Sequence, residues 1–283
     1  MSLDNVLNHW ADYRKGAEEG GFHDPKGNHP YEHRWTMAIN LDLCNGCNAC
    51  STACYAENNL AVVGKERFEK GQAMNWMRIE RYWDHNAQDF PQQGASFLPM
   101  MCQQCGSATC EPVCPVAATY HTPDGLNAQV YNRCIGSRYC ANNCPYRVRY
   151  FNFYSYYDEA WPEPMQQQLN PDISVRDKGV MEKCTFCVQR IRAAKDKAKM
   201  EDRAVRDGEV MPACAQACPT SAIVFGDTQD ENSIISRLWK QQQVKRGVAH
   251  QDKTDPDLRG YRIFEELNVD PSVMYLERVR EEI

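Results

Sequence analysis

Residues 44–54 read CNGCNACSTAC, and the fold is built around this stretch. It sets Cys44, Cys47, Cys50 and Cys54 in the spacing C-x2-C-x2-C-x3-C. The whole chain has 283 residues and 15 Cys. An odd number of cysteines cannot all form disulfides, and a chain of this length can build a core without such staples. The thiols are therefore expected to serve as metal ligands.

The other cysteines fall into three more groups. The second group reads C-x2-C-x4-C-x3-C, the third reads C-x5-C-x3-C, and the fourth combines a C-x2-C and a C-x3-C pair. A proline follows the last cysteine of each of these groups, at Pro115, Pro145 and Pro219. The members are Cys102, Cys105, Cys110 and Cys114; Cys134, Cys140 and Cys144; and Cys184, Cys187, Cys214 and Cys218. Every cysteine belongs to a group, so none is spare for nucleophilic catalysis.

These spacings match the bacterial ferredoxin run C-x2-C-x2-C-x3-C-P, which binds iron–sulfur clusters. A tight loop with a cysteine at every third residue wraps three corners of a cubane, and its backbone N–H groups offset the negative charge of the cluster. The fourth cysteine, beside the proline, faces away and binds the other cluster in two-cluster ferredoxins. The chain is therefore predicted to hold four clusters.

The third group keeps the ferredoxin spacing but has Ser137 at the position of its central ligand. Three thiolates suit a [3Fe–4S] cluster, in which one iron corner is absent. The alternative is that the Ser137 oxygen binds iron and the cluster remains a cubane. A hydroxyl is a poor ligand beside thiolates, so the sequence favours the trinuclear cluster.

The exchange of the fourth ligand predicts which cysteines share a cluster, if groups one and four pair and groups two and three pair. Three [4Fe–4S] clusters would then be held by Cys44, Cys47, Cys50 and Cys218; by Cys54, Cys184, Cys187 and Cys214; and by Cys102, Cys105, Cys110 and Cys144. The [3Fe–4S] cluster would be held by Cys114, Cys134 and Cys140. Spacing alone does not prove this connectivity.

The sequence disfavours zinc as the metal bound by the cysteines and nucleic acid as a binding partner. C-x2-C pairs also occur in zinc sites, but zinc knuckles come in pairs rather than in runs of four cysteines. No histidine lies within ligand spacing of any group, His121 being the nearest. The formal net charge of −6 argues against nucleic acid as a partner, because phosphate binding needs a positive surface.

The segments between the cysteine groups predict an α+β fold with two ferredoxin-like lobes, inserted loops and long N- and C-terminal extensions. Residues 35–43 (WTMAINLDL) alternate apolar and polar and predict a half-buried strand. Short strands are also predicted at 99–101, 116–120 and 222–226. Asp124-Gly125 predicts the turn of a hairpin.

The predicted domains follow from the pairing of the cysteine groups. The first lobe takes residues 35–60 with 181–226, and the second lobe takes residues 97–154. The remaining segments are an N-terminal arm, an insert, an inserted loop and a C-terminal tail, at 1–34, 61–96, 155–180 and 227–283. The tail is polar and is expected to wrap a neighbouring subunit.

Residues 181–206 are helical by pattern, because Cys184, Cys187 and Ile191 recur on one face. This prediction places the C-x2-C pair on the buried face of a helix and Lys183 on its solvated face. Basic residues also surround the third cysteine group and are candidates for tuning a cluster: Arg133, Arg138, Arg147 and Arg149. Ser137, Arg133 and Arg138 are the predicted cofactor-binding residues besides the cysteines.

The four groups, the Cys-Pro ends and the inserts resemble the four-cluster electron-transfer subunits of the complex iron–sulfur molybdoenzyme family. Within it, the iron–sulfur parts of alternative complex III and of the menaquinone reductase (Qrc) complex are the more similar. The resemblance spans residues 35–283 and is carried by YNRCIGSRYCANNCPYRVRYFNF, MEKCTFCVQRI, RAVRDGEVMPACAQACPTSAIVFGD and FEELNVDPSVMYL.

The resemblance implies an electron-transfer subunit of a respiratory quinone oxidoreductase complex, with no bond chemistry of its own. Its partners would be an NrfD-like polytopic quinone-binding membrane subunit, a multihaem cytochrome c subunit and a molybdopterin-oxidoreductase-like subunit. In such subunits the trinuclear cluster lies nearest the quinone site.

Location and an alternative function remain open from the sequence. Members of this type sit on the periplasmic face of the inner membrane. Residues 1–30 show no apolar h-region and no twin-arginine pair, so export with a signal-bearing partner is expected, and the cytoplasmic face is the alternative. The alternative function is a soluble polyferredoxin that serves a cytosolic reductase. The long segments without cysteines favour the complex subunit.

Overall fold

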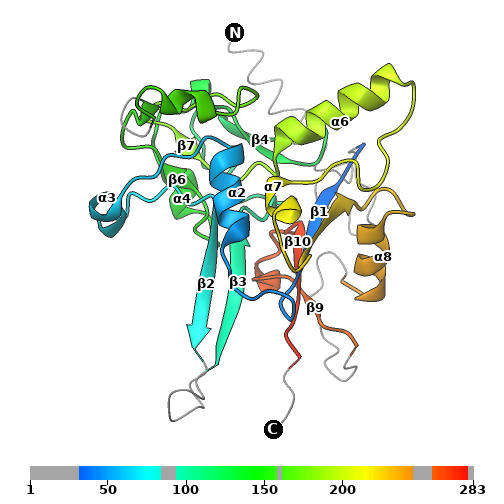
Figure 1. Ribbon diagram of the computed structural model, residues 1–283. Helices are drawn as coiled ribbons and strands as arrows, with labels where there is room; N and C mark the ends of the chain where they lie inside the picture. Colours follow the sequence, from blue (N-terminus) through cyan, green and yellow to red (C-terminus); the bar gives the residue numbers. More distant parts are fainter. Residues whose placement is uncertain (1–31, 84–93, 158–160, 245–256, 280–283) are drawn as a thin grey trace.

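A four-stranded sheet in the order β8–β1–β10–β9 organises the part of the chain that carries the first and fourth cysteine groups (Figure 1). The computed structural model describes residues 32–83, 94–157, 161–244 and 257–279. The four strands are β1 (Trp35–Asn40), β8 (Ile223–Asp227), β9 (Gly260–Tyr261) and β10 (Val273–Leu276). β8 runs antiparallel to β1, whereas β10 runs parallel to it and pairs antiparallel with β9.

The central strand β1 is buried on both faces. Trp35 and Met37 pack into the main hydrophobic core. Ala38 faces the other way and packs against Ile235 of α8 (Ile234–Gln241). The prediction of a strand here is confirmed, but the prediction that it is half-buried is wrong, because α8 covers the second face.

The C-terminal segment supplies an inner strand of this sheet. β10 pairs with β1 from Met37↔Val273 to Asn40↔Leu276, and Tyr275 is fully buried. The expectation that the tail wraps a neighbouring subunit is therefore wrong for residues 273–276, which the chain's own sheet covers. The N-terminal arm lies outside the described residues except for 32–34.

Three two-stranded ribbons complete the described β structure. They are β2 (Met77–Trp83) with β3 (Ala95–Met101), β4 (Thr119–His121) with β5 (Asn127–Gln129), and β6 (Tyr150–Phe151) with β7 (Met181–Glu182). The β2–β3 ribbon projects from the body, and its exposure rises toward Trp83 (Figure 1). The hairpin predicted at Asp124-Gly125 is confirmed, and the strand predicted at 222–226 agrees with β8 to within a residue. The strand predicted at 99–101 is present but begins four residues earlier, and the strand predicted at 116–120 covers only 119–121.

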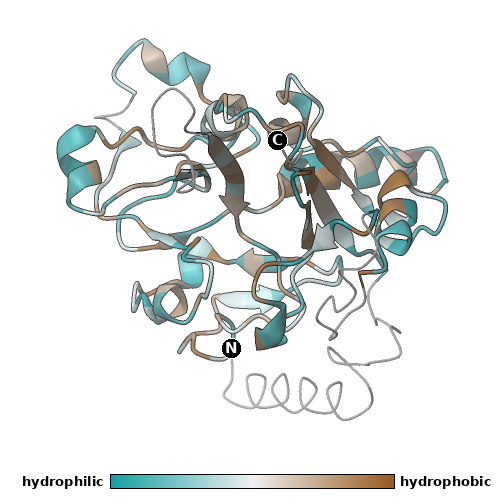
Figure 2. Ribbon diagram, turned by 90° about the horizontal axis from the view of Figure 1, so that it is seen from below, coloured by the Kyte–Doolittle hydropathy of each residue, from teal (hydrophilic) through white to brown (hydrophobic). Residues whose placement is uncertain are grey.

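The helices flank the cysteine loops and the outer surface. They are α2 (Ala49–Glu57), α3 (Lys65–Glu69), α4 (Tyr139–Asn142), α6 (Val188–Met200), α7 (Ala213–Gln216) and α8, with 3-10 turns at Tyr131–Arg133, Met165–Gln168 and Glu265–Leu267. In Figure 2 the hydrophobic colour lies mainly on the strands, whereas the outlying helices are largely hydrophilic. Within the described ranges, no helix has the length and apolar character needed to cross a bilayer.

The helix predicted over residues 181–206 covers only Val188–Met200. Phe186 and Cys187 have φ of 56° and 53°, a left-handed backbone conformation that ends any continuous right-handed helix. The C-x2-C pair therefore lies in a loop before the helix and not on its face. Lys183, predicted to be solvated, is fully buried.

Candidate metal centres

All 15 cysteines lie in the described residues, and all of them are free thiols. The first group of thiols, called site one here, lines a single cavity with an apolar wall that includes Ile39 and Ile223. Its members are Cys44, Cys47, Cys50 and Cys218. Burial raises the pKa of Cys50 to about 11, and the negative charges of the three neighbouring thiolates add to the effect.

Site two consists of Cys54, Cys184, Cys187 and Cys214. Burial raises the pKa of Cys54 well above its usual value, and the other three thiolates raise it further. Several N–H groups point at sulfur in this site. The N–H of Phe186 donates to Cys184 Sγ at 3.5 Å, and Asn58 Nδ2 donates to Cys54 Sγ at 3.6 Å.

Site three consists of Cys102, Cys105, Cys110 and Cys144. Burial is the largest cause of the raised pKa of Cys105, and the negative charges of the other three thiolates raise it further. One charged donor reaches this site, because Arg149 Nη1 lies 3.3 Å from Cys110 Sγ. Such a donor would offset negative charge on the ligand sulfur.

Site four is a cavity lined by three thiols and one hydroxyl, from Cys114, Cys134, Cys140 and Ser137. Backbone N–H groups donate to two of the sulfurs. The N–H of Ala118 lies 3.2 Å from Cys114 Sγ, and the N–H of Met181 lies 3.4 Å from Cys134 Sγ. The structure therefore brings together the sets of cysteines that the exchange rule pairs, and their roles as ligands remain predictions.

Sites one and four are built on loops with the same backbone pattern. Gly46 and Gly136 hold the same place in the two loops, with φ of 71° and 73°. A Cβ added to Gly46 would lie 2.4 Å from the ring of Phe97, and one added to Gly136 would lie 2.5 Å from the carbonyl oxygen of Gly179. Only glycine combines this φ with so close an approach.

The pattern continues two residues later, where Asn48 and Arg138 have φ of 65° and 59°. Each is followed at once by a short helix, α2 in one loop and α4 in the other. When the two loops are aligned in this way, Ser137 takes the place of Cys47, and both residues are exposed. The serine thus replaces one ligand within a geometry that the two loops otherwise share.

The Cys-Pro turns have a shared geometry of their own. The residue three positions after Cys114 and the residue three positions after Cys218 have φ of 47° and 53°. The next N–H in each turn then donates to the cysteine sulfur, at 3.2 Å from Ala118 and 3.3 Å from Ala222. Although burial acts in the opposite direction, the Thr220 hydroxyl and backbone N–H groups hold the pKa of Cys218 below its usual value.

The four sites form a row. Burial is the largest cause of the raised pKa of Cys214 in site two, and neighbouring thiolates, which include Cys50 of site one, raise it further. Burial raises the pKa of Cys184 in site two to about 12, and Cys102 of site three adds to it. Sites three and four meet in one hydrophobic cluster that contains Cys110 and Cys140. The order is therefore one, two, three, four, with exposed residues at both ends.

The arginines predicted to bind the cofactor lie at the outer end of site four. Arg138 lines the cavity, and its guanidinium lies 5.1 Å from the centre of the Phe151 ring. Arg133 is exposed and donates from Nη1 to the carbonyl of Ala117 at 3.0 Å. Sequence reasoning missed the burial of Lys183 between the sites, because its contacts are with a distant part of the chain.

The spacing of the thiols fits a cluster better than a single ion. A tetrahedral zinc ion with Zn–S bonds of about 2.3 Å holds its sulfurs about 3.8 Å apart. Among the described residues, the only three ligand atoms within 4.8 Å of one another belong to Glu32, His33 and Asp124, not to cysteines. The thiols are spread more widely, as the corners of an iron–sulfur cube require.

Comparison with known proteins agrees with this donor set. Residues 43–118 match the family described as the 4Fe-4S dicluster domain. The chain is 42% identical to the menaquinone reductase iron-sulfur cluster-binding subunit of Nitratidesulfovibrio vulgaris, over 88% of this chain and 90% of that protein. It is 34% identical to the Hdr-like menaquinol oxidoreductase iron-sulfur subunit 1 of Archaeoglobus fulgidus, over 80% and 82%.

A third relative is the NrfC homolog of Haemophilus influenzae, which is 31% identical over 75% of this chain and 73% of that protein. The matches to the first two relatives run through most of the length of both partners and so include both halves of the cysteine framework. The chain therefore belongs to the family of iron–sulfur electron-transfer subunits of the complex iron–sulfur molybdoenzyme type.

Proposed function

We propose that the chain holds [4Fe–4S] clusters in sites one, two and three and a [3Fe–4S] cluster in site four. It would carry electrons between a membrane quinone site and multihaem cytochrome or molybdopterin-like partner subunits of a respiratory complex. When bound, such clusters supply one-electron transfer. The observation that carries the proposal is the succession of four neighbouring thiol sites, with an exposed residue at each end, Cys47 in site one and Ser137 in site four.

The residues of the chain would hold and insulate the clusters. The thiols of sites two and three are largely buried, and apolar core residues surround them. Backbone and side-chain N–H groups that point at sulfur would favour the more reduced, more negative state. We further propose the two ferredoxin-like lobes as the unit of this arrangement, with β1 and β8 in the first and the β4–β5 hairpin in the second.

The partners and the location are also proposals. The relatives are named as subunits of a menaquinone reductase and of a menaquinol oxidoreductase, which supports a quinone-linked complex. An NrfD-like membrane subunit would face site four. We propose the periplasmic face of the inner membrane as the location, reached with a partner. Protease added to intact spheroplasts should then cleave the chain, and protection until lysis would place it on the cytoplasmic face.

Analysis of non-haem iron and sulfide in the purified complex, with any clusters of the partner subunits subtracted, tests the proposal directly. Three four-iron clusters and one three-iron cluster give about 15 iron atoms per chain. The chain should copurify with membranes and c-type haem. A fully loaded chain that purifies alone, as a stable monomer free of haem, would instead support the soluble polyferredoxin.

A further inference from the structure

Two cations are buried between the thiol sites. The exposed fraction of Lys183 is 0%, and that of Arg149 is 6%. A buried charge is strongly unfavourable unless an opposite charge or a set of hydrogen bonds compensates it. The groups that surround each cation therefore indicate which negative charge it compensates.

Arg149 lies at the junction of sites three and four. Its Nη1 donates to Cys110 Sγ at 3.3 Å, and its Nη2 donates to Thr119 Oγ1 at 2.7 Å. Burial acts against the charge, but Cys110 and Cys140 raise the pKa of the guanidinium above its usual value. Its Nε is buried with no hydrogen-bond partner among the described residues, which leaves one N–H free to donate to a cluster sulfur.

Lys183 lies at the junction of sites two and three. Its Nζ donates to the carbonyl oxygens of Asn127, at 2.5 Å, and of Cys184, at 3.0 Å. Cys184 belongs to site two, and the side chain of Asn127 reaches site three, because its Oδ1 lies 3.8 Å from Cys110 Sγ. The ammonium group thus sits between ligands of two sites.

Asn127 joins the two cations. Its main-chain oxygen accepts from Lys183, and its Oδ1 accepts from Arg149 Nη1 at 3.3 Å. The nearby carboxylate of Glu111 lies 2.5 Å from His121 Nδ1 and accepts from Asn127 Nδ2 at 2.6 Å. That acid is therefore engaged with His121, whereas the hydrogen bonds of the two cations described above go to neutral oxygens and a thiol.

We infer that Lys183 and Arg149 raise the reduction potentials of the two sites that each one joins, sites two and three for Lys183 and sites three and four for Arg149. The inference rests on the proposed ligand sets. Reduction adds one negative charge to a site, and a cation a few ångströms away in a water-poor interior stabilises that charge. Site three is flanked by both cations, and site one by neither.

The test is a potentiometric titration of the assembled complex, followed by EPR, in the variants Arg149→Gln and Lys183→Met. In Arg149→Gln the ratio of reduced to oxidised centre at a fixed potential should fall at least about tenfold for sites three and four, a shift of about 59 mV for a one-electron couple. In Lys183→Met the same fall should appear at sites two and three. Site one should change less than about threefold in either variant.

Lys178→Gln is the matched control, because Lys178 is exposed and precedes Gly179, whose carbonyl oxygen closely approaches Gly136 of the site-four loop. Water and salt screen an exposed charge, so its removal should change the ratio at site four less than about threefold. An equal shift at all four sites, or no shift at sites three and four in Arg149→Gln, would overturn the inference.

Iron content distinguishes a failure of the proposed function from a failure of the role of the cations. A wild-type complex in which this chain does not account for about 15 non-haem iron atoms contradicts the proposed function itself. Full iron with unchanged potentials contradicts only the role of the cations.

If the Arg149→Gln chain does not take up its clusters, the variant Arg149→Lys tests the inference instead, since lysine keeps the positive charge but not the two-pronged set of N–H donors. If the ratio of reduced to oxidised centre at sites three and four then stays within about threefold of wild type, the inference is supported. A tenfold fall in that ratio would assign the effect to the hydrogen bond with Cys110 and overturn the inference.

Discussion

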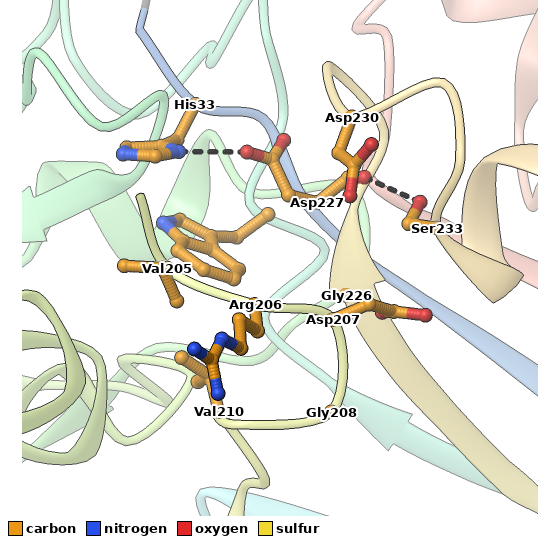
Figure 3. Close-up of a pocket in the computed structure, with 11 residues that line it drawn as sticks. His33, Val205, Arg206, Asp207, Gly208, Val210, Gly226, Asp227, Asp230 and Ser233 are labelled. Carbon is orange, nitrogen blue, oxygen red and sulfur yellow. Dashed lines mark hydrogen bonds and ion pairs between the residues drawn. The ribbon is translucent and has the colours of Figure 1, made fainter. Parts of the chain in front are cut away.

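His33 Nδ1 lies 2.7 Å from Asp227 Oδ2, so the segment that enters β1 is joined to the last residue of β8 (Figure 3). The other carboxylate oxygen of Asp227 accepts from the N–H of Arg34 at 2.8 Å. The ring of His33 also stacks on Trp35, with 5.4 Å between ring centres. The hydrogen bond to Asp227 raises the pKa of His33, although burial acts in the opposite direction.

The sign of the resulting pH dependence follows from this direction. A histidine whose pKa is higher in the folded than in the unfolded state stabilises fully below its unfolded pKa of about 6.5, and the effect is lost as the pH rises through the folded pKa. His33→Gln should therefore lower the free energy of unfolding by about 1 kcal/mol at low pH and by much less at high pH. Denaturant unfolding of the loaded chain at pH about 5.5 and 9 measures this. An equal loss at both pH values contradicts it.

Ser137→Cys should convert site four from a three-iron to a four-iron centre. The new thiol would stand where Cys47 stands in site one, on a loop of the same backbone pattern. The iron content should rise from about 15 to about 16 per chain, and the EPR signal of the oxidised protein near g of about 2 should disappear. Ser137→Ala is the control and should keep that signal. Its loss in the alanine variant would identify the hydroxyl as a ligand, and its persistence in the cysteine variant would refute the trinuclear assignment.

Gly46→Ala should prevent the loading of site one. The new Cβ would meet the Phe97 ring at 2.4 Å, and a φ of 71° is strained for alanine, so we expect the ligand loop to leave its position. We expect a loss of about four iron atoms per chain, measured by iron analysis. Gly64→Ala is the matched control, because its φ is 79° but nothing lies within 4 Å of the added Cβ. It should cost about 1 kcal/mol of backbone strain and leave the iron content unchanged.

Tyr275→Phe should destabilise the fold by about 1–3 kcal/mol, because the change removes two buried hydrogen bonds. The Tyr275 hydroxyl donates to the carbonyl of Pro99 at 2.8 Å and accepts from Gln103 Nε2 at 3.2 Å. Tyr261→Phe serves as control, since Tyr261 lies beside Tyr275, with 5.8 Å between ring centres, and is only half-buried. Thermal unfolding of the two variants should differ clearly, and equal midpoints would show that the hydroxyl contributes nothing.

Local patterns in the sequence predicted the parts of the fold that local geometry determines. The cysteine spacings, the β1 and β8 segments and the turn at Asp124-Gly125 all depend on residues close in the chain. The helix over 181–206 was predicted too long, because Cys184 and Cys187 are spaced for a ligand loop and fit a helical period only by coincidence.

What the sequence could not indicate depends on contacts between distant segments. The strand at residues 273–276 is a short apolar run, and nothing local shows that it pairs with β1. Lys183 has the composition of a surface residue, and its burial is compensated by the carbonyl of Asn127 from another ribbon. Tertiary contacts of this kind override local preference.

The place of β10 inside the sheet has a consequence for biosynthesis. β1 is translated before the two segments that complete its edges, β8 and then β10. Until then its N–H and C=O groups form open edges, which invite pairing with other nascent chains. Cys50 and Cys218 are likewise separated by most of the chain. The proposed site one can therefore be completed only after residue 218 has been translated, and a product that stops before this residue lacks one of the four thiols.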